Sequence, residues 1–382
     1  MSDAVIVAAV RSPIGRAHKG SLASARPDDL LVQILDALFA HLPGFDPASV
    51  EDLIVGTASP RAEQGYNLAR VAALLAGLTQ VPGTTVNRYC ASSLQAIRMA
   101  AHAVRAGEGD VFVAAGVESV SRYPTGGPDE DGFENPRFSA GGLPDAYIAM
   151  GQTAENVAER CGISRADMDE FALSSQTRTA KAIADGFFDI DITPVRRPDG
   201  ATVAVDDSPR PNTTSEGLAA LRPSFRPDGR VTAGNACPLN DGAAAVLVMS
   251  RARAEELGLT PRARIVASAV TGIDPEIMGL GPVQACRRAL GRAGMTIADV
   301  DLVEINEAFA AQVIPSMRQL GIPADKLNVH GGGIALGHPF GMTGARIMTT
   351  LLNGLDRTGG TIGLEAMCVG GGQGMAMIVE RL

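Results

Sequence analysis

The sequence predicts an α/β protein built around a mostly parallel sheet that helices cover on both faces. Short apolar, β-branched runs alternate with segments in which apolar residues recur at helical spacing. This alternation is typical of strands joined by crossover helices. The strand runs are apolar without interruption, which is expected when both faces of a sheet are buried. The second half of the chain loosely repeats the order of elements in the first, so two similar halves are expected.

In the first half, the helical segments have recognisable beginnings and ends. One helix begins after Pro27, where two aspartates suit the positive end of the helix and the following leucines and isoleucine share one face. A second helix follows Cys90 and ends at Gly107, a residue that commonly terminates helices. The strands between these helices are predicted at 5–10, 52–57, 84–87 and 111–117.

Residues 118–242 interrupt this pattern. They are rich in Pro, Gly, Asp and Ser, and they enclose a helical pair at 151–161 and 165–184. Long loops in compact proteins usually cover functional sites. We therefore predict an insertion of loops and helices that lies over the sheet.

The regular pattern returns after the insertion. We predict strands at 243–249, 264–270 and 300–304, helices at 282–293 and 343–353, and a glycine-interrupted hairpin at 361–380. The chain of 382 residues then divides into an N-terminal domain, 1–265, which carries the insertion at about 118–242, and a C-terminal domain, 266–382.

Composition narrows the functional classes. The formal charge of −9 and the 4% aromatic content disfavour nucleic acid and anionic membranes as partners, although a local basic patch would still allow an anionic ligand. No apolar run approaches the length of a membrane span, and the N-terminus has the pattern of a buried strand instead of a signal peptide. Five scattered cysteines without a C-x-x-C pair suggest reduced thiols and a cytoplasmic protein, and their spacing does not favour zinc.

Cys90 is the first candidate for chemistry, in the segment VNRYCASSLQAI (86–97). It falls where a strand passes into a helix, and backbone N–H groups at a helix N-terminus stabilise a thiolate. We therefore expect a lowered pKa at Cys90. The alternative is a buried, inert cysteine.

His338 is the second candidate, between Gly337 and Pro339 in GGGIALGHPFGMTGAR (331–346). Histidine is the usual general base near neutral pH, and the glycines allow a ligand to approach the backbone. A histidine whose ring is satisfied within a turn is the alternative. The other four histidines have no comparable setting.

Two further segments could complete a site. Cys368 begins CVGGGQGMA (368–376), and N–H groups in glycine-rich turns, such as that of Gly370, can bind an oxyanion. A bulge or hairpin turn is the alternative. Asn306 and Glu307 follow an apolar run, where Asn306 could orient a water or a carbonyl and Glu307 could orient a His or a Cys. A polar helix N-terminus is the alternative.

Taken together, these blocks resemble the thiolase family, the acyl-CoA C-acetyltransferases. The resemblance covers essentially the whole chain. Its motifs are IVAAVRSPIG (6–15), GVESVSR (116–122), MGQTAENVAER (150–160), VTAGNACPLNDGAAAVLVMS (231–250) and INEAFAAQ (305–312), in addition to the segments around the two cysteines and the histidine.

The resemblance implies a role for each candidate. Cys90 matches the acyl-accepting nucleophile, His338 the base that activates it, and Cys368 the second acid/base. Asn306 matches the residue that holds a water, which together with the histidine stabilises one oxyanion. The N–H groups of Cys90 and Gly370 match the second oxyanion hole. The implied reaction is reversible thiolytic cleavage of 3-ketoacyl-CoA, as in fatty acid metabolism, through a thioester intermediate on Cys90.

The family's coenzyme A contacts match further positions: Ala308 and Phe309 near the pantetheine, Met150 and Leu143 in the loop domain, and Arg210 near the adenine and phosphates. Two residues depart from acetyl-specific members, which have His where this chain has Ala149 and Ser where it has Cys237. The resemblance therefore leaves room for an acyl chain longer than acetyl.

The implied fold is the thiolase fold, two similar α/β halves in a layered αβαβα arrangement with an inserted loop domain. A homodimer or homotetramer is expected, with acyl-CoA and CoA as partners. No metal or separate cofactor is implied, because coenzyme A is substrate and product. A ketoacyl synthase would lack CVGGGQG. A non-catalytic, thiolase-like protein that binds acyl-CoA or lipid would have lost Cys90 or His338.

Overall fold

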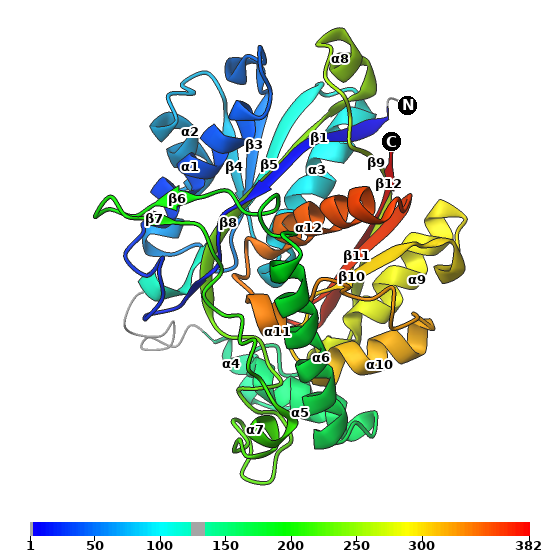
Figure 1. Ribbon diagram of the computed structural model, residues 1–382. Helices are drawn as coiled ribbons and strands as arrows, with labels where there is room; N and C mark the ends of the chain where they lie inside the picture. The colour runs from blue at the N-terminus through cyan, green and yellow to red at the C-terminus, as the bar shows by residue number, and fades with distance from the viewer. Residues whose placement is uncertain (1–2, 124–133) are drawn as a thin grey trace.

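The computed structural model describes residues 3–123 and 134–382, and its strands form a ten-stranded mixed sheet with the order β10-β11-β12-β9-β1-β8-β5-β3-β4, in which β2 also pairs with β8 (Figure 1). The first half contributes β1 (Ala4–Arg11), β2 (Gly15–Arg16), β3 (Asp52–Gly56), β4 (Gly83–Val86), β5 (Val111–Ser119) and β8 (Asn240–Ser250). The second half contributes β9 (Ala263–Gly272), β10 (Leu302–Ile305), β11 (Ile362–Val369) and β12 (Gln373–Arg381).

The expected repeat is present in the strand order. In the first half the order is β1-β8-β5-β3-β4, and in the second it is β9-β12-β11-β10. A parallel bridge between Val303 and Leu327 stands where β4 stands in the first half. The halves join through a short antiparallel pairing of β1 with β9 at Val5 and Ile6.

The prediction of a mostly parallel sheet is wrong. Among residues 3–123 and 134–382, three pairs of strands in this sheet are parallel, β3–β4, β3–β5 and β10–β11. Its other pairs, formed by β1, β2, β5, β8, β9, β11 and β12, are antiparallel. Strands such as β8 are buried along their whole length because helices cover both faces. An apolar run of this kind is the same for either direction, so the direction of pairing depends on the connections and not on the run itself.

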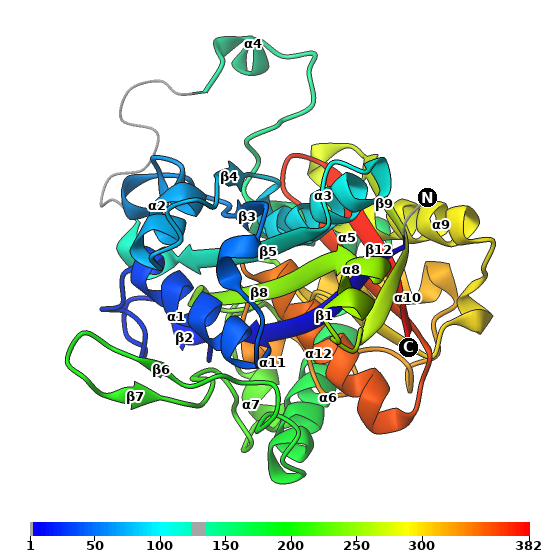
Figure 2. The same cartoon turned by 90° about the horizontal axis from the view of Figure 1, so that it is seen from above.

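Helices lie in three layers around the two halves. The outer layer of the first half has α1 (Pro27–Ala40) and α2 (Leu68–Leu75), and that of the second half has α9 (Gly281–Ala293) and α10 (Ala310–Leu320). Between the halves lie α3 (Ser92–Ala106) and α12 (Thr343–Thr358), as Figures 1 and 2 show. Shorter helices are α8 (Arg251–Glu256), α11 (Gly333–Leu336) and the 3₁₀ turns η1 (Pro47–Ser49), η2 (Ala62–Gln64), η3 (Tyr89–Ala91), η4 (Val120–Arg122), η5 (Pro275–Leu280) and η6 (Ile297–Asp299).

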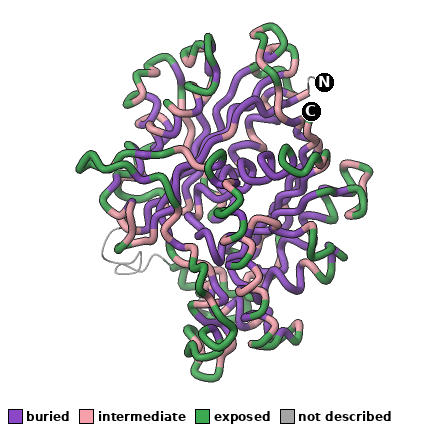
Figure 3. Tube along the Cα trace, in the orientation of Figure 1, coloured by how far each residue is buried: buried purple, intermediate pink, exposed green. Residues whose placement is uncertain are grey.

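Buried residues concentrate in the central strands and helices (Figure 3). Alternate residues of the strands belong to separate cores between these layers. On β8, Leu247 and Met249 pack toward α1, whereas Val246 and Val248 pack toward α3 and α12. A third core lies between the strands of the second half and the helices α9 and α10. Burial of each Leu, Ile or Val side chain in these cores contributes about 1.5–3 kcal/mol to the free energy of unfolding. Since cores lie between successive layers of helices and strands, the layered αβαβα arrangement is present.

Most helices of the insertion between β5 and β8 gather at one end of the molecule, whereas its short two-stranded hairpin lies beside α1 (Figure 1). It contains α4 (Pro136–Ser139), α5 (Met150–Arg160), α6 (Arg165–Ala184), β6 (Val195–Arg196), β7 (Thr202–Val203) and α7 (Ser215–Ala219). Its own apolar cluster includes Ala308, Phe309 and Cys368, so the insertion packs directly on the ends of second-half elements. Figure 2 shows the segment that carries α4 standing away from the body of the molecule.

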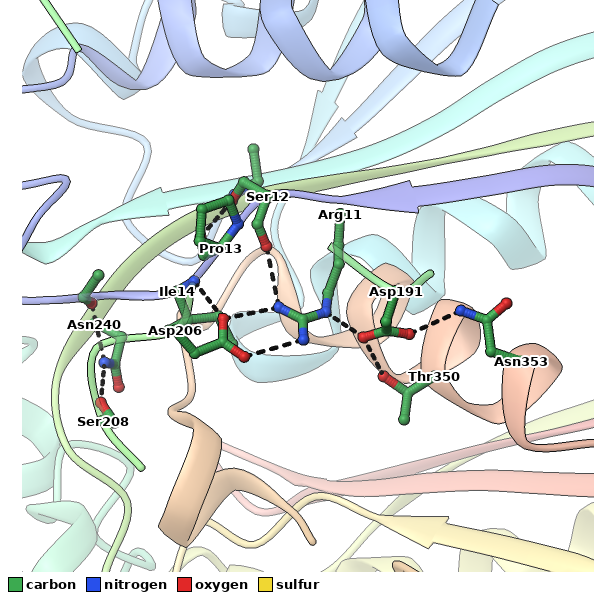
Figure 4. A network of polar contacts seen from close by, with 12 residues as sticks. Arg11, Ser12, Pro13, Ile14, Asp191, Asp206, Ser208, Asn240, Thr350 and Asn353 are labelled. Atoms are coloured by element: carbon green, nitrogen blue, oxygen red, sulfur yellow. Dashed lines mark hydrogen bonds and ion pairs between the residues drawn. The ribbon is translucent and has the colours of Figure 1, made fainter. Parts of the chain in front are cut away.

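Arg11 anchors the insertion to the sheet (Figure 4). This fully buried guanidinium, at the end of β1, forms ion pairs with Asp191 and Asp206, both from the insertion. Asp206 also accepts the N–H of Ile14 at 2.7 Å, and Asp191 accepts the amide of Asn353 on α12 at 2.9 Å. A buried ion pair is tolerated when other donors satisfy its carboxylates, as they do here.

Candidate active site

Cys90 lies in η3, immediately before α3, where the backbone is forced into an uncommon conformation. Tyr89 has a φ of 44°, in the left-handed region that non-glycine residues rarely adopt. The side chain of Asn87 accepts the N–H of Tyr89 at 2.7 Å, and the hydroxyl of Ser92 donates to the Tyr89 carbonyl at 2.7 Å. Non-glycine residues in this region cluster at functional sites when their surroundings hold them there. Here the tight turn places Cys90 immediately before the first residue of α3.

The Cys90 thiol borders a cavity of about 360 Å³. The cavity is lined by Ala58, Tyr89, Cys90, Glu134, Ala146, Tyr147, Ile148, Met150, Phe340, Gly370 and Gly371. The backbone N–H of Gly370 donates to the Cys90 sulfur and lowers its pKa, but burial outweighs this donor and raises the pKa to about 12. The expectation of a lowered pKa is therefore wrong for the resting protein, because desolvation of the thiolate exceeds the stabilisation by nearby N–H groups.

His338 follows Gly337, whose φ of 114° is open only to glycine. A Cβ at that position would lie 2.7 Å from the side chain of Asn240, so a larger residue would displace it. Asn240 in turn accepts the backbone N–H of His338 at 3.0 Å and donates to Ser208 at 3.2 Å. Figure 4 shows this asparagine beside the Arg11 network. The position of the histidine is therefore tied to the anchoring of the insertion.

The His338 ring has a defined tautomer. Its Nδ1 lies 2.6 Å from Oγ1 of Thr343, and that hydroxyl donates its only proton to the carbonyl of Pro339 at 2.8 Å. The hydroxyl oxygen must then accept, so Nδ1 carries the ring proton. Nε2 is buried, has no partner among residues 3–123 and 134–382, and keeps a free lone pair. Burial, together with the charge of Arg346, lowers the pKa of His338 to about 3, which keeps the ring neutral.

The two turns that hold Cys90 and His338 pack against each other across Gly116 on β5. A Cβ on Gly116 would lie 2.1 Å from the carbonyl oxygen of Gly341 and 2.6 Å from the side chain of Ser93. Ser93 Oγ also accepts the N–H of Ala345 at 2.9 Å. Because only glycine permits this approach, the starts of α3 and α12 meet at the end of the sheet.

Glu118 is a buried carboxylate that the sequence analysis did not assign, although it lies in the quoted motif GVESVSR. It accepts the N–H of Gly341 at 2.8 Å, the N–H of Ala58 at 2.8 Å, the amide of Gln64 at 2.6 Å and the hydroxyl of Tyr123 at 2.8 Å. It thereby joins the His338 turn to the wall of the Cys90 cavity. A Glu is rarely buried without such partners. The signal available in the sequence was a Glu directly after the apolar run 111–117, which is predicted to be a buried strand.

Cys90 lies close enough to Cys368 and Cys237 for its charge to raise the pKa of both thiols. Cys368 is fully buried near the end of β11, and burial followed by the charges of Cys90 and Cys237 raises its pKa well above the usual range. Burial likewise raises the pKa of Cys237, whose N–H donates to the Ala308 carbonyl at 3.0 Å. The structure therefore brings three thiols together, all protonated at rest.

Asn306 is buried, and in the part of the chain that the structure describes neither its side-chain oxygen nor its side-chain nitrogen has a partner. A buried amide without partners is costly unless a water or ligand satisfies it. The neighbouring Glu307 is occupied differently, because it accepts from Ser175 at 2.6 Å, Asn328 at 2.9 Å and the N–H of Ile334 at 3.2 Å. Glu307 thus fastens α11 and α6 to the site and does not face Cys90 or His338 through any of these bonds.

The residues expected at coenzyme A fall in different places. Met150 lines the Cys90 cavity. Arg210 lines a second cavity of about 380 Å³, together with Arg16, Leu218 and Gly234. Phe309 pairs through its backbone with Ala236 and packs edge-on against Phe225 at 6.1 Å. Leu143 is exposed and lines neither cavity.

Among residues 3–123 and 134–382, no helix is both long and apolar enough to cross a membrane. The same part of the chain holds no cluster of three or more His, Cys, Asp or Glu side chains suited to a metal ion.

Comparison with known proteins agrees with this geometry. The family model of the thiolase N-terminal domain matches residues 4–252, and that of the thiolase C-terminal domain matches residues 259–381. Beta-ketoadipyl-CoA thiolase of Acinetobacter baylyi is 46% identical, and 3-ketoacyl-CoA thiolase of Bacillus subtilis is 44% identical, in each case over 100% of both chains. The crystal structure of the Bacillus anthracis acetyl-CoA acetyltransferase superposes with a TM-score of 0.92 at 42% identity, covering 100% of this chain and 99% of that one. The chain belongs to the thiolase family.

Proposed function

We propose that this thiolase-family acyltransferase cleaves 3-ketoacyl-CoA with coenzyme A, reversibly, through an acyl-enzyme on Cys90. The observation that carries the proposal is that the Cys90 thiol and the Gly370 N–H that donates to it meet at one cavity. The buried Cys368 thiol lies close enough to Cys90 for the charge of Cys90 to raise its pKa. The neutral His338, with its free Nε2, is held in the neighbouring turn. These groups supply a nucleophile, a base, an acid and an oxyanion donor.

In the cleavage direction, the Cys90 sulfur attacks the 3-keto carbon while its proton passes to Nε2 of His338. The raised pKa of Cys90 and the lowered pKa of His338 mean that this proton moves during attack and not beforehand. The N–H groups of Cys90 and Gly370 stabilise the oxygen that becomes negative. One such donor is worth roughly 3 kcal/mol.

Breaking the C2–C3 bond leaves an acyl thioester on Cys90 and an acetyl-CoA enolate. Cys368, protonated at rest, donates its proton to C2 of the enolate. The unpartnered amide of Asn306 holds a water that, with His338, stabilises the enolate oxygen. Coenzyme A then gives its thiol proton to Cys368 and attacks the thioester, and Cys90 recovers its proton from His338.

The cavity at Arg16 and Arg210 suits the phosphates of coenzyme A, since both guanidinium groups line it. This local positive charge resolves the difficulty raised by the net charge of −9. Cys237, Ala308 and Phe309 pack in the same apolar cluster as Cys368 and as Leu218, which lines this cavity. In the proposal they form the wall along the pantetheine. No metal or separate cofactor takes part in the proposed steps.

The proposal extends to the assembly of the protein. Residues 1–265, with the insertion, and residues 266–382 act as the two thiolase domains of a cytoplasmic homodimer or homotetramer. Support comes from β4, which ends the strand order of the sheet, and from the exposed Tyr66, Leu74 and Leu75 nearby in sequence. An unpaired strand edge with exposed apolar side chains favours association. Light scattering of the purified protein tests this part, and a monomer at micromolar concentration would contradict it.

The decisive experiment for the reaction is mass spectrometry after mixing with acetyl-CoA. One acetyl group should appear on the Cys90 peptide. It should be absent in Cys90→Ala and present in Cys161→Ala. Cys161 is a matched control because it is a partly exposed thiol at the C-terminal end of α5, whereas the first turn of that helix lies at the cavity. If Cys90→Ala exchanges acetyl groups with coenzyme A at nearly the normal rate, Cys90 is not the nucleophile. A protein that binds acyl-CoA without any acyl transfer would instead be the non-catalytic alternative.

A further inference from the structure

The two cavities of the proposed site differ in charge. The cavity at Arg210 contains two guanidinium groups and no carboxylate among its lining residues. The cavity at Cys90 is lined mainly by aromatic and apolar side chains, and among the described residues its one carboxylate is that of Glu134, an exposed side chain at its border. No Lys, Arg or His is among the lining residues in the part of the chain that the structure describes. The charged end of the thioester therefore suits the first cavity and the acyl chain the second.

Nearby basic residues are engaged elsewhere. Arg122 donates to Glu63 at 2.5 Å, and Arg88 donates to Gln95 at 2.9 Å and to Gln373 at 2.8 Å. The stretch 124–133, which precedes Glu134 in the sequence, contains three acidic residues and no Lys, Arg or His. It cannot supply a cation to any site. Arg137, on α4, is the basic residue closest to Glu134 along the chain.

We propose that the acyl cavity accepts 3-ketoacyl chains that end in an uncharged group and discriminates against chains that end in a carboxylate. This inference rests on the proposed function. A terminal carboxylate would leave water for an apolar cavity that offers it a like charge at Glu134 and no cation. Burial of an unpaired charge is costly, and a like charge at close range adds to that cost. Relatives that share 46% identity carry names for a dicarboxylic substrate, so similarity alone would suggest the opposite preference.

The test compares two six-carbon substrates, 3-oxohexanoyl-CoA and 3-oxoadipyl-CoA, which differ in the terminal methyl and carboxylate. Acetoacetyl-CoA serves as a third substrate. The full-length protein should cleave 3-oxohexanoyl-CoA with a kcat/KM at least about fivefold higher than 3-oxoadipyl-CoA, the size expected of one like-charge contact at an exposed carboxylate. Glu134→Gln should reduce that ratio severalfold. Glu108→Gln, which removes an exposed carboxylate after α3, should leave it unchanged.

Three results would overturn the inference: a preference for 3-oxoadipyl-CoA, a ratio near one, or a ratio that Glu134→Gln does not change. If 3-oxoadipyl-CoA is preferred and Arg137→Ala abolishes that preference, Arg137 supplies the cation and the argument from charge is wrong. Failure of the proposed function would be different, because none of the three substrates would be cleaved and no acyl group would form on Cys90.

Discussion

Replacing Thr343 with valine should remove the contact that keeps the ring proton of His338 on Nδ1. Valine has nearly the shape of threonine, so the apolar packing at the start of α12 is retained. The variant loses both bonds of the hydroxyl, the 2.6 Å contact with Nδ1 and the 2.8 Å bond to the Pro339 carbonyl. Thr343→Ser keeps the hydroxyl and is the matched control.

The expected magnitude follows from burial. Thr343 and His338 are both almost completely buried, so no water replaces the hydroxyl readily. A buried N–H left without an acceptor costs about 1–3 kcal/mol. That cost falls on the tautomer that the proposed mechanism needs, and it corresponds to roughly a 5- to 150-fold loss of that tautomer. We expect kcat for thiolysis to fall by a similar factor in Thr343→Val, whereas Thr343→Ser stays within about threefold of the wild type.

Two measurements separate a catalytic effect from general damage. Steady-state thiolysis should show the loss in kcat with little change in KM, because Thr343 lines neither cavity. Nitrogen-15 chemical shifts of histidine-labelled protein should show protonated Nδ1 at His338 in the wild type and in Thr343→Ser, and a shift toward protonated Nε2 in Thr343→Val. If Thr343→Val keeps normal turnover, or loses turnover without any change of tautomer, the argument from the hydroxyl is refuted.

Four further predictions concern other parts of the molecule. Because the pKa of His338 is lowered to about 3, the pH profile of kcat/KM should show no ionisation near pH 6.5. The free energy of unfolding should fall from pH 6.5 toward pH 3, because in this range only the unfolded state binds the additional proton. An acid limb of the pH profile near 6.5 that His338→Asn abolishes would contradict this prediction. Cys368→Ser should lose turnover by about 10²–10⁴-fold, together with exchange of the acetyl-CoA methyl protons in deuterated water, while Cys90 still reacts with iodoacetamide; retained exchange, measured by NMR, would transfer the carbon-acid role to another residue. Arg11→Ala should lower the free energy of unfolding by about 3–5 kcal/mol in denaturant titrations, because two buried carboxylates lose their cation, and a loss below 1 kcal/mol would show that the network is not essential. Because Ala149 and Cys237 stand where acetyl-specific members have His and Ser, six- and eight-carbon 3-ketoacyl-CoA should be cleaved with a higher kcat/KM than acetoacetyl-CoA, and a steep preference for acetoacetyl-CoA would refute this.

Much of the secondary structure could be predicted from local patterns. The helical pair expected at 151–161 and 165–184 is α5 and α6, and the hairpin expected at 361–380 is β11 and β12. The helix expected to end at Gly107 does so, with Gly107 at a φ of 76°. These features depend on periodicity and on single terminating residues, which neighbouring sequence alone can specify. Strand direction was not predictable in this way, because a run buried on both faces contains no sign of its partner's direction.

For the candidate site, too, the sequence predicted some properties and not others. Residue types at particular places in the chain were enough to single out Cys90, His338, Cys368 and Asn306, because thiols, imidazole and amides are few and their glycine-rich or helix-initial settings are local. The protonation states of these groups could not be inferred from the neighbouring sequence. The expected thiolate at Cys90 is a neutral thiol in the structure, since burial by distant segments outweighs the helix terminus.

The sequence by itself therefore determined which chemical groups this protein possesses and which elements carry them. Only the tertiary structure decided how those groups meet and in which state. Thr343 holds the His338 tautomer, Glu118 joins two turns that are more than 200 residues apart, and Arg11 fastens the insertion over the sheet. The Glu118 and Arg11 contacts link residues from separate segments, whereas the Thr343 contact is short-range in the chain and depends on the fold of its turn. Burial, which sets the pKa of a thiol or an imidazole, is a property of the packed whole.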